Sequence, residues 1–303
     1  MLRPTRRSAL AAGLGIVSST CLPLVGTPAV WAIPPVERNG KPKFKFSLAA
    51  YSYRDLLSGK TPRLKLEDFI RDCAAMGLEG TELTSYYFPA DADAAYLRRL
   101  KKLCFELGLD ISGTAVGNDF GHPPGDKRDQ QIALVKKWVD YAEILGAPVI
   151  RVFAGHAKPG VTPEETHRLM VAGLEECCEY AGQHGVFLAL ENHGGPTATA
   201  AGLLAFVRDV QSPWFGVNLD SGNFSSADVY DELAQIAPFA LNAQIKVVVT
   251  GPDKKKQPSD LPRLAALLRA AGYRGYIVLE YEEAGDPRTE CPKFIDQLRA
   301  AFA

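Results

Sequence analysis

The stretch LALENH at residues 188–193 is a short apolar run that ends abruptly in three polar side chains. A run of this length, followed by the turn signal Gly194-Gly195, predicts a buried β-strand. Three later stretches repeat the pattern: GVNLD at 216–220, AQIK at 243–246 and IVLE at 277–280. Longer amphipathic segments with a period near 3.6 lie between such runs, so strands and helices alternate and the strands are expected to be parallel.

Outward from this stretch, the unit of one strand and one helix occurs eight times. The expected strands centre near Ala49, Leu83, Gly113, Arg151, Leu190, Asn218, Ile245 and Leu279. Successive centres are about 33 residues apart on average, which suits a (β/α)8 barrel of roughly 250 residues. Helix signals agree with this pattern, because Thr162-Pro163 opens one helix, and Asp91 precedes another that Gly108 ends. The sequence therefore predicts an α/β fold, a single-domain TIM barrel over residues 44–303.

The first 32 residues have a different character. They hold Arg6-Arg7, an apolar stretch at 9–17, a small-residue exit and no acidic residue. This layout predicts a secretory signal peptide at 1–32, followed by a linker at 33–43. The run around Arg6-Arg7 resembles a twin-arginine signal, which implies a periplasmic or otherwise extracytoplasmic protein. A membrane anchor is the alternative, but the apolar stretch is well short of the roughly 18 residues that span a bilayer, so we expect no stable membrane span after signal removal.

The composition limits the class of partner. The chain has 303 residues, of which 47% are hydrophobic and 23% charged, as in ordinary globular proteins. Its 34 Lys and Arg residues are balanced by 35 Asp and Glu residues, for a net charge of -1. Binding to nucleic acid relies on an excess of positive charge, so we expect no nucleic-acid partner.

Four oxygen-bearing side chains lie at or near the ends of consecutive strands: Glu191, Asp220, Gln244 and Glu280. They are expected to converge, because the C-terminal ends of the strands form the active site of such barrels. Three carboxylates and an amide oxygen are hard ligands that suit one divalent ion, Mn²⁺ or Mg²⁺, with Co²⁺ tolerated. The alternative is that separate acids pair with Arg151 and Lys246 or with water. Mutual repulsion of three gathered carboxylates favours the metal.

These four residues, in the runs LENHGG, NLDSGNF, QIK and VLEYE, resemble the xylose isomerase-like barrel superfamily of sugar isomerases and epimerases, which includes the ketose 3-epimerases. The likeness covers roughly residues 44–303. It implies a Glu, Asp, His, Glu metal set whose two glutamates also transfer protons, roles that fall in order on Glu191, Asp220, Gln244 and Glu280. The chain departs from the family pattern at Gln244, where many members have His, and at Asn223, where ketose epimerases have the His of an Asp-x-x-His motif.

Six residues are expected to bind substrate: His156, His193, Asn223, Lys246, Tyr51 and Glu82. His193 and Lys246 each lie two residues beyond an expected ligand and so share its strand face. Tyr51 and Glu82 on the first two strands, with the aromatic run 86–88, would wall a sugar pocket. The alternatives left open are ordinary loop histidines, an ion pair between Lys246 and a nearby carboxylate, and simple packing of the aromatic rings.

The leading hypothesis is a divalent-metal-dependent isomerase or epimerase acting on a ketose, inosose or keto-glycoside, with Glu191 and Glu280 as catalytic residues. One ion can bind adjacent carbonyl and hydroxyl oxygens and stabilise the enediolate that proton removal forms. A lyase, hydratase or dehydratase acting on 3-keto-glycosides would use the same enolate chemistry. A sugar-binding barrel without catalysis is the non-enzymatic alternative. The expected partner is a small carbohydrate substrate, and a homo-oligomer is left open.

Overall fold

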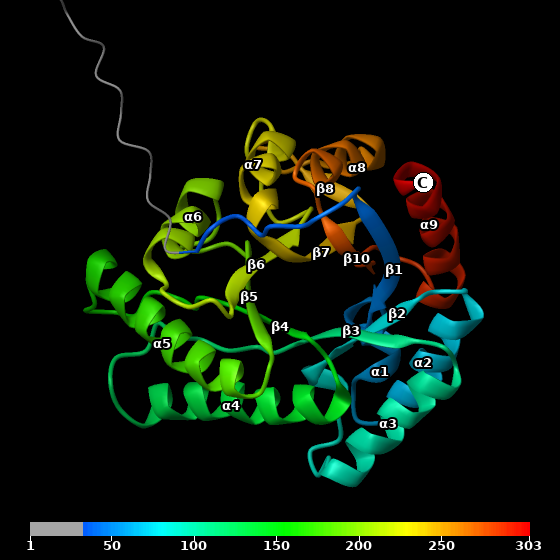
Figure 1. Ribbon diagram of the computed structural model, residues 1–303, viewed down its shortest axis with the longest axis horizontal. Helices are drawn as coiled ribbons and strands as arrows, with labels where there is room; N and C mark the ends of the chain where they lie inside the picture. The colour runs from blue at the N-terminus through cyan, green and yellow to red at the C-terminus, as the bar shows by residue number, and fades with distance from the viewer. Residues whose placement is uncertain (1–32) are drawn as a thin grey trace, which may run out of the picture. The chain divides into compact units, whose positions relative to one another are not determined.

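The computed structural model describes residues 33–303, and eight parallel strands within them form a closed barrel. The order around the barrel is β1-β10-β7-β6-β5-β4-β3-β2, so each strand is paired on both sides (Figure 1). The barrel strands are β1 (Lys43–Ala49), β2 (Gly80–Thr84), β3 (Asp110–Ala115), β4 (Val149–Val152), β5 (Phe187–Glu191), β6 (Phe215–Asp220), β7 (Ala240–Lys246) and β10 (Arg274–Glu280). All eight strand centres expected from the sequence fall within these strands, which confirms the single-domain TIM barrel.

Helices surround the barrel (Figure 1). The α-helices are α1 (Arg54–Leu57), α2 (Leu66–Ala75), α3 (Ala94–Glu106), α4 (Asp126–Leu145), α5 (Pro163–Gln183), α6 (Ala200–Asp209), α7 (Val229–Ile236), α8 (Leu261–Ala270) and α9 (Pro287–Phe302). Within residues 33–303 the short 3₁₀ helices are η1 (Ala50–Tyr53), η2 (Ser85–Tyr87) and η3 (Ala237–Phe239). The expected cap of α5 is present, since the Thr162 hydroxyl accepts a hydrogen bond from the Glu165 amide at 3.2 Å. The cap of α3 is Asp93 and not Asp91, because Asp93 accepts the Tyr96 amide at 2.7 Å.

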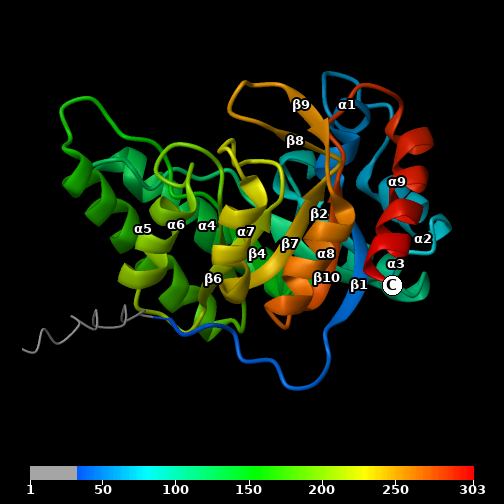
Figure 2. The same ribbon diagram turned by 90° about the horizontal axis from the view of Figure 1, so that it is seen from above.

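A small antiparallel hairpin follows β7 and was not expected from the sequence. It consists of β8 (Val248–Thr250) and β9 (Lys256–Pro258). Each strand is only three residues long, and the lysine run at 254–256 reads as a solvated loop, so no periodic signal marks it. Figure 2 shows the hairpin at the same end of the barrel as α1.

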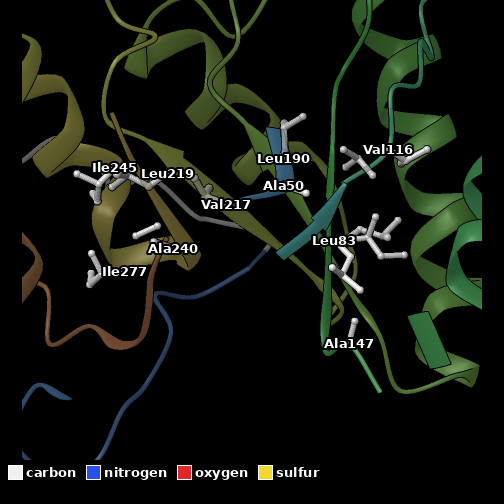
Figure 3. Packing of buried hydrophobic residues seen from close by; sticks show 14 of the residues in the cluster. Ala50, Leu83, Val116, Ala147, Leu190, Val217, Leu219, Ala240, Ile245 and Ile277 are labelled. Carbon is white, nitrogen blue, oxygen red and sulfur yellow. The ribbon is translucent and has the colours of Figure 1, made fainter. Parts of the chain in front are cut away.

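The apolar core lies between the barrel wall and the helices. Leu219, Ile245 and Ile277 on β6, β7 and β10 are fully buried there (Figure 3). Burial of a side chain of this size contributes roughly 1.5–3 kcal/mol. Because side chains alternate along a strand, the neighbours Asp220 and Gln244 point the other way, into the barrel. The packing of the outer face therefore fixes which polar groups face inward.

Only part of the N-terminal prediction can be compared with the structure. The signal peptide expected at 1–32 lies outside the described residues. Strand β1 begins at Lys43, one residue before the expected start of the barrel. Within residues 33–303 there is no helix with the length and apolar character needed to cross a membrane.

Candidate active site

Three of the expected carboxylates meet at the barrel mouth. Glu191, Asp220 and Glu280 are the last residues of β5, β6 and β10, and their exposed fractions are 3%, 0% and 5%. Lys246, at the end of β7, lies among them, with Nζ 3.3 Å from Asp220 Oδ2 and 3.4 Å from Glu280 Oε2. A further acid, Glu282, lies 3.1 Å from the same ammonium group.

A second buried cation, Arg151, forms an ion pair with Glu191 on the opposite side of the cluster. Arg151 on β4 places Nε 2.8 Å from Glu191 Oε2. Its Nη1 group donates to the Val116 carbonyl at 3.0 Å, and its guanidinium lies 4.1 Å from the centre of the Phe153 ring. The ion pairs that the sequence offered as an alternative to a metal, with Arg151 and Lys246, are therefore both present.

Gln244 lies below the acids, and hydrogen bonds hold both ends of its amide. Its Nε2 donates to Glu82 Oε1 at 2.6 Å, and its Oε1 accepts from Asn218 Nδ2 at 2.6 Å. Asn242 Nδ2 donates to the other Glu82 oxygen at 2.9 Å. Glu82 is completely buried and lies among amides beneath the mouth. The sequence placed it on the wall of an open pocket, and the structure does not.

Burial dominates the electrostatics of this cluster. It raises the pKa of Glu82 to about 7 and that of Asp220 to about 6, because a buried carboxylate loses its hydration. Burial also raises the pKa values of Glu191 and Glu280, and each is raised further by the negative charge of the other acids. Burial alone would lower the pKa of Lys246, but the charges of the surrounding acids raise it, so its ammonium group stays charged.

The charges of this cluster do not balance. Glu82, Glu191, Asp220, Glu280 and Glu282 lie in or under the mouth, and within residues 33–303 only Arg151 and Lys246 form ion pairs with any of them. An excess of buried negative charge is the condition that a divalent cation relieves.

The donor set fits a hard divalent ion. Asp220 Oδ2 is buried without a hydrogen-bond donor, and the Gln244 carbonyl accepts one hydrogen bond where it can accept two. In the described part of the chain, no group of three or more His, Cys, Asp or Glu side chains is placed so that it could hold a metal ion as it stands. Entry of an ion would require Lys246 to leave its place between Asp220 and Glu280.

Asn223, in the turn after β6, bridges the acids and the lysine. Its Nδ2 donates to Glu191 Oε1 at 2.9 Å, and its Oδ1 accepts from Lys246 Nζ at 3.1 Å. Asn192 joins β5 to β6, because its amide exchanges two hydrogen bonds with the Asp220 backbone at 2.8 and 2.9 Å. Asn223 therefore lies among the expected metal ligands, and its role in binding substrate stays a prediction.

The other expected substrate residues lie on the rim. His156 and His193, in the loops after β4 and β5, line one small cavity of about 60 Å³, and both are exposed. The His193 ring packs on Phe153 with 4.3 Å between centroids. Tyr51, in η1, is half-buried, and its ring packs edge-on against Tyr86 at 6.3 Å. Their roles in binding substrate remain predictions.

Sequence reasoning gave no positive role to several polar groups of the cluster. Arg151 entered it only as an alternative ion-pair partner, although an arginine inside the buried four-residue strand VIRV signals a buried acid as partner. Asn218 and Asn242 lie two residues before Asp220 and Gln244, so the period of two along β6 and β7 would have placed them on the inner face.

Comparison with known proteins places this geometry in a family. The model of the xylose isomerase-like TIM barrel family matches residues 70–300. L-ribulose-5-phosphate 3-epimerase UlaE of Escherichia coli is 28% identical over 211 residues, which cover 65% of this chain and 74% of that protein.

Two solved structures share the fold. D-psicose 3-epimerase from Clostridium cellulolyticum H10 superposes with a TM-score of 0.69 at 15% identity, over 85% of this chain and 99% of that one. The probable 3-DHS dehydratase AsbF of Bacillus anthracis gives a TM-score of 0.66 at 19% identity, over 84% of this chain and 98% of that one. By the family match over residues 70–300, the chain belongs to the xylose isomerase-like TIM barrel family.

Proposed function

We propose that the protein is a sugar isomerase or epimerase that moves a proton at a carbon next to a keto group. The observation that carries the proposal is the pair of buried glutamates, Glu191 and Glu280, at one polar mouth. Burial raises the pKa of both groups. A general acid or base works best when its pKa lies near the working pH, so two such groups suit removal and return of a proton.

The two glutamates approach from different sides of the mouth. Strands β5 and β10 are separated by β6 and β7 in the barrel order, so their terminal side chains can address different faces of a bound sugar. Arg151 holds Glu191 through its guanidinium, and Asn223 donates to the other Glu191 oxygen. Both contacts favour the ionised form of Glu191, so we assign it as the base that removes the first proton.

Glu191, Asp220, Gln244 and Glu280 are the residues that would hold a divalent ion, Mn²⁺ or Mg²⁺. When bound, such an ion supplies Lewis-acid stabilisation of negative charge on substrate oxygens. Lys246, once released from Asp220 and Glu280, would remain beside Asn223 as a donor for a substrate hydroxyl or carbonyl. Asn192 fixes the end of β6 and thereby the direction of the Asp220 carboxylate.

Solvent-deuterium incorporation tests the proposal. The Mn²⁺-supplemented protein is incubated in D2O with a panel of ketoses, inososes and 3-keto-glycosides, and the products are identified by NMR and mass spectrometry. We expect at least one substrate to gain deuterium at the carbon next to its keto group, and Glu191→Gln to abolish most of that exchange. Glu106→Gln, on the exposed face of α3, is the matched control and should exchange at the wild-type rate.

The products separate the alternatives. An isomer or epimer carrying deuterium supports the proposal, whereas loss of a leaving group would replace it by a lyase. Saturable sugar binding without exchange of any substrate would overturn catalysis and favour a binding protein.

We further propose that the protein is exported through the twin-arginine route, from Arg6-Arg7 and the acid-free segment 1–32. Replacing both arginines by lysine should retain the protein in the cytoplasm. Unchanged extracytoplasmic protein in cell fractions would contradict this route.

A further inference from the structure

A cavity of about 790 Å³ lies at the same end of the barrel as the acid cluster and has no part in the chemistry described above. It lies between residues 57–67, which run from the end of α1 into α2, and residues 86–99, which run from η2 into α3. A volume of this size is in the range of ligand-binding pockets. Both segments follow strands at the C-terminal end of the barrel, the end that carries the acids.

Aromatic rings form one part of its lining. Tyr86, Tyr87, Phe88 and Tyr96 all contribute to the wall. The Tyr86 and Tyr87 rings stand nearly perpendicular, at 79° and 6.2 Å between centroids. Tyr86 is 45% exposed, and among the large hydrophobic side chains of residues 33–303 only Phe105 and Leu107 are exposed as well. Aromatic faces of this kind can pack against the apolar face of a sugar ring.

Charged groups without ion-pair partners form the other part. Asp91 and Arg99 line the cavity, and neither forms an ion pair within residues 33–303. The Arg99 guanidinium lies over the Tyr96 ring, 5.3 Å from its centre. A carboxylate and a guanidinium beside aromatic rings offer an acceptor and a donor for hydroxyl groups.

Tyr86 connects the cavity to the catalytic acids. Tyr86 lies close enough to Arg151 to act on its charge, and Arg151 Nε in turn lies 2.8 Å from Glu191 Oε2. Its ring also contacts Tyr51, whose pKa is raised by burial and by the charges of Glu282 and Glu280. The cavity therefore begins one side chain away from the acid cluster.

We propose that this cavity is the subsite for a second sugar residue, so that the substrate is a glycoside or disaccharide. The keto-bearing ring would lie over Glu191 and Glu280, and the second residue would lie against Tyr86, Tyr87 and Arg99. This inference rests on the proposed function, because it assigns the acid cluster to the reacting ring.

Binding of unreactive sugars tests the subsite by itself. Isothermal titration compares D-glucose with maltose, cellobiose and trehalose, using the Mn²⁺-supplemented protein. We expect at least one disaccharide to bind at least 10-fold more tightly than glucose. Arg99→Ala should reduce this preference about 2- to 10-fold, as for loss of one hydrogen bond, and Ala92→Trp should remove it by filling the cavity.

Arg98→Ala is the matched control, because Arg98 is exposed on the same turn of α3 but does not line the cavity. It should keep the wild-type preference. Equal affinity for glucose and all three disaccharides, or a preference that survives Ala92→Trp in folded protein, would overturn the subsite.

The deuterium assay keeps the two proposals apart. Exchange of simple ketoses without any disaccharide preference would refute the subsite and leave the proposed function standing. A disaccharide preference without exchange of any substrate would refute the function and leave the subsite standing.

Discussion

The two halves of the barrel mouth differ in what surrounds their polar groups. In the acid half, formed by the ends of β4, β5, β6, β7 and β10, polar side chains below 10% exposure are joined by ion pairs: Glu191 with Arg151, and Asp220 and Glu280 with Lys246. In the aromatic half, formed by the segments after β1 and β2, Tyr86 is 45% exposed beside an open cavity. Proton transfer benefits from groups that water does not reach, whereas recognition of a variable ligand needs accessible surface. The contrast suggests that chemistry and recognition are divided between the halves.

The largest effect is expected from the acid half at Glu280. Glu280→Gln keeps an oxygen ligand but removes the acid–base group, so we expect turnover to fall by about 10² to 10⁴-fold. Metal content, measured by elemental analysis, should stay near that of the wild type. Glu176→Gln, an exposed glutamate on α5, provides the control. Near-normal turnover of metal-loaded Glu280→Gln would show that Glu280 is only a metal ligand. It would then contradict the assignment of proton transfer to the acid half.

A second test removes the cation that the acid half holds. Lys246→Met leaves Asp220, Glu280 and Glu282 without their ammonium partner, which should lower the free energy of unfolding of the metal-free protein by about 3–5 kcal/mol. Urea denaturation measures this loss, and Mn²⁺ should restore stability at lower concentration than in the wild type. Lys255→Met, at an exposed pair, should cost less than about 1 kcal/mol. Weaker metal binding by Lys246→Met would show that the lysine does not compete with the ion.

A third test addresses the residue that links the halves. Glu82 belongs to β2, the strand that leads to Tyr86, but its carboxylate accepts from Gln244 and Asn242 of β7. Glu82→Gln lets the Gln244 amide turn over, so we expect metal affinity to fall by about 10- to 100-fold. Thr84→Val on the same strand is the control, since the Thr84 hydroxyl has no partner to lose. Unchanged metal affinity in Glu82→Gln would mean that the orientation of the Gln244 amide does not affect metal binding.

The smallest effect is expected from pH. The pKa of Glu82 is raised to about 7 in the folded protein, and Glu191 and Glu280 are raised in the same direction. Between an unfolded value near 4.3 and this folded value the native state holds more protons than the unfolded state. The metal-free protein should therefore lose at least about 1.4 kcal/mol of stability as pH rises from 5 to 7.5.

Urea midpoints in EDTA at the two pH values test this expectation. Mn²⁺ should cancel the loss at pH 7.5, because it binds the ionised acids, and Glu280→Gln should reduce the slope. A free energy of unfolding that rises between pH 5 and 7.5 in the metal-free protein would contradict this expectation. It would mean that the acid half does not bury carboxylates without enough cations.

The fold was largely predictable because its signals are local. Eight expected strand centres all lie in barrel strands, and the Thr162 cap was found at its residue. The misses were short or weakly marked features: the cap of α3 at Asp93 and the hairpin of β8 and β9. Three-residue strands carry too few residues for a period to show.

The places of the expected site residues at the strand ends were predictable, whereas their contacts with one another were predictable only in part. The ends of β5, β6, β7 and β10 marked Glu191, Asp220, Lys246 and Glu280, because the C-terminal ends of barrel strands meet at one mouth. The sequence left open whether Lys246 faces substrate or pairs with acids, and the structure places it between Asp220 and Glu280. The sequence marked the aromatic run 86–88 as a pocket wall, but not the second wall of the cavity at residues 57–67, since two segments separated in the sequence form it.

By itself the sequence determined the alternation of strand and helix and the strand ends that carry acids, because side-chain periodicity and turn residues act over a few positions. Only the tertiary structure decided which polar groups meet. Glu82 and Gln244 are 162 positions apart, yet share a hydrogen bond of 2.6 Å once the barrel closes. Barrel closure also buries the acids with too few cations, and that loss of hydration, which no local pattern encodes, sets their pKa values.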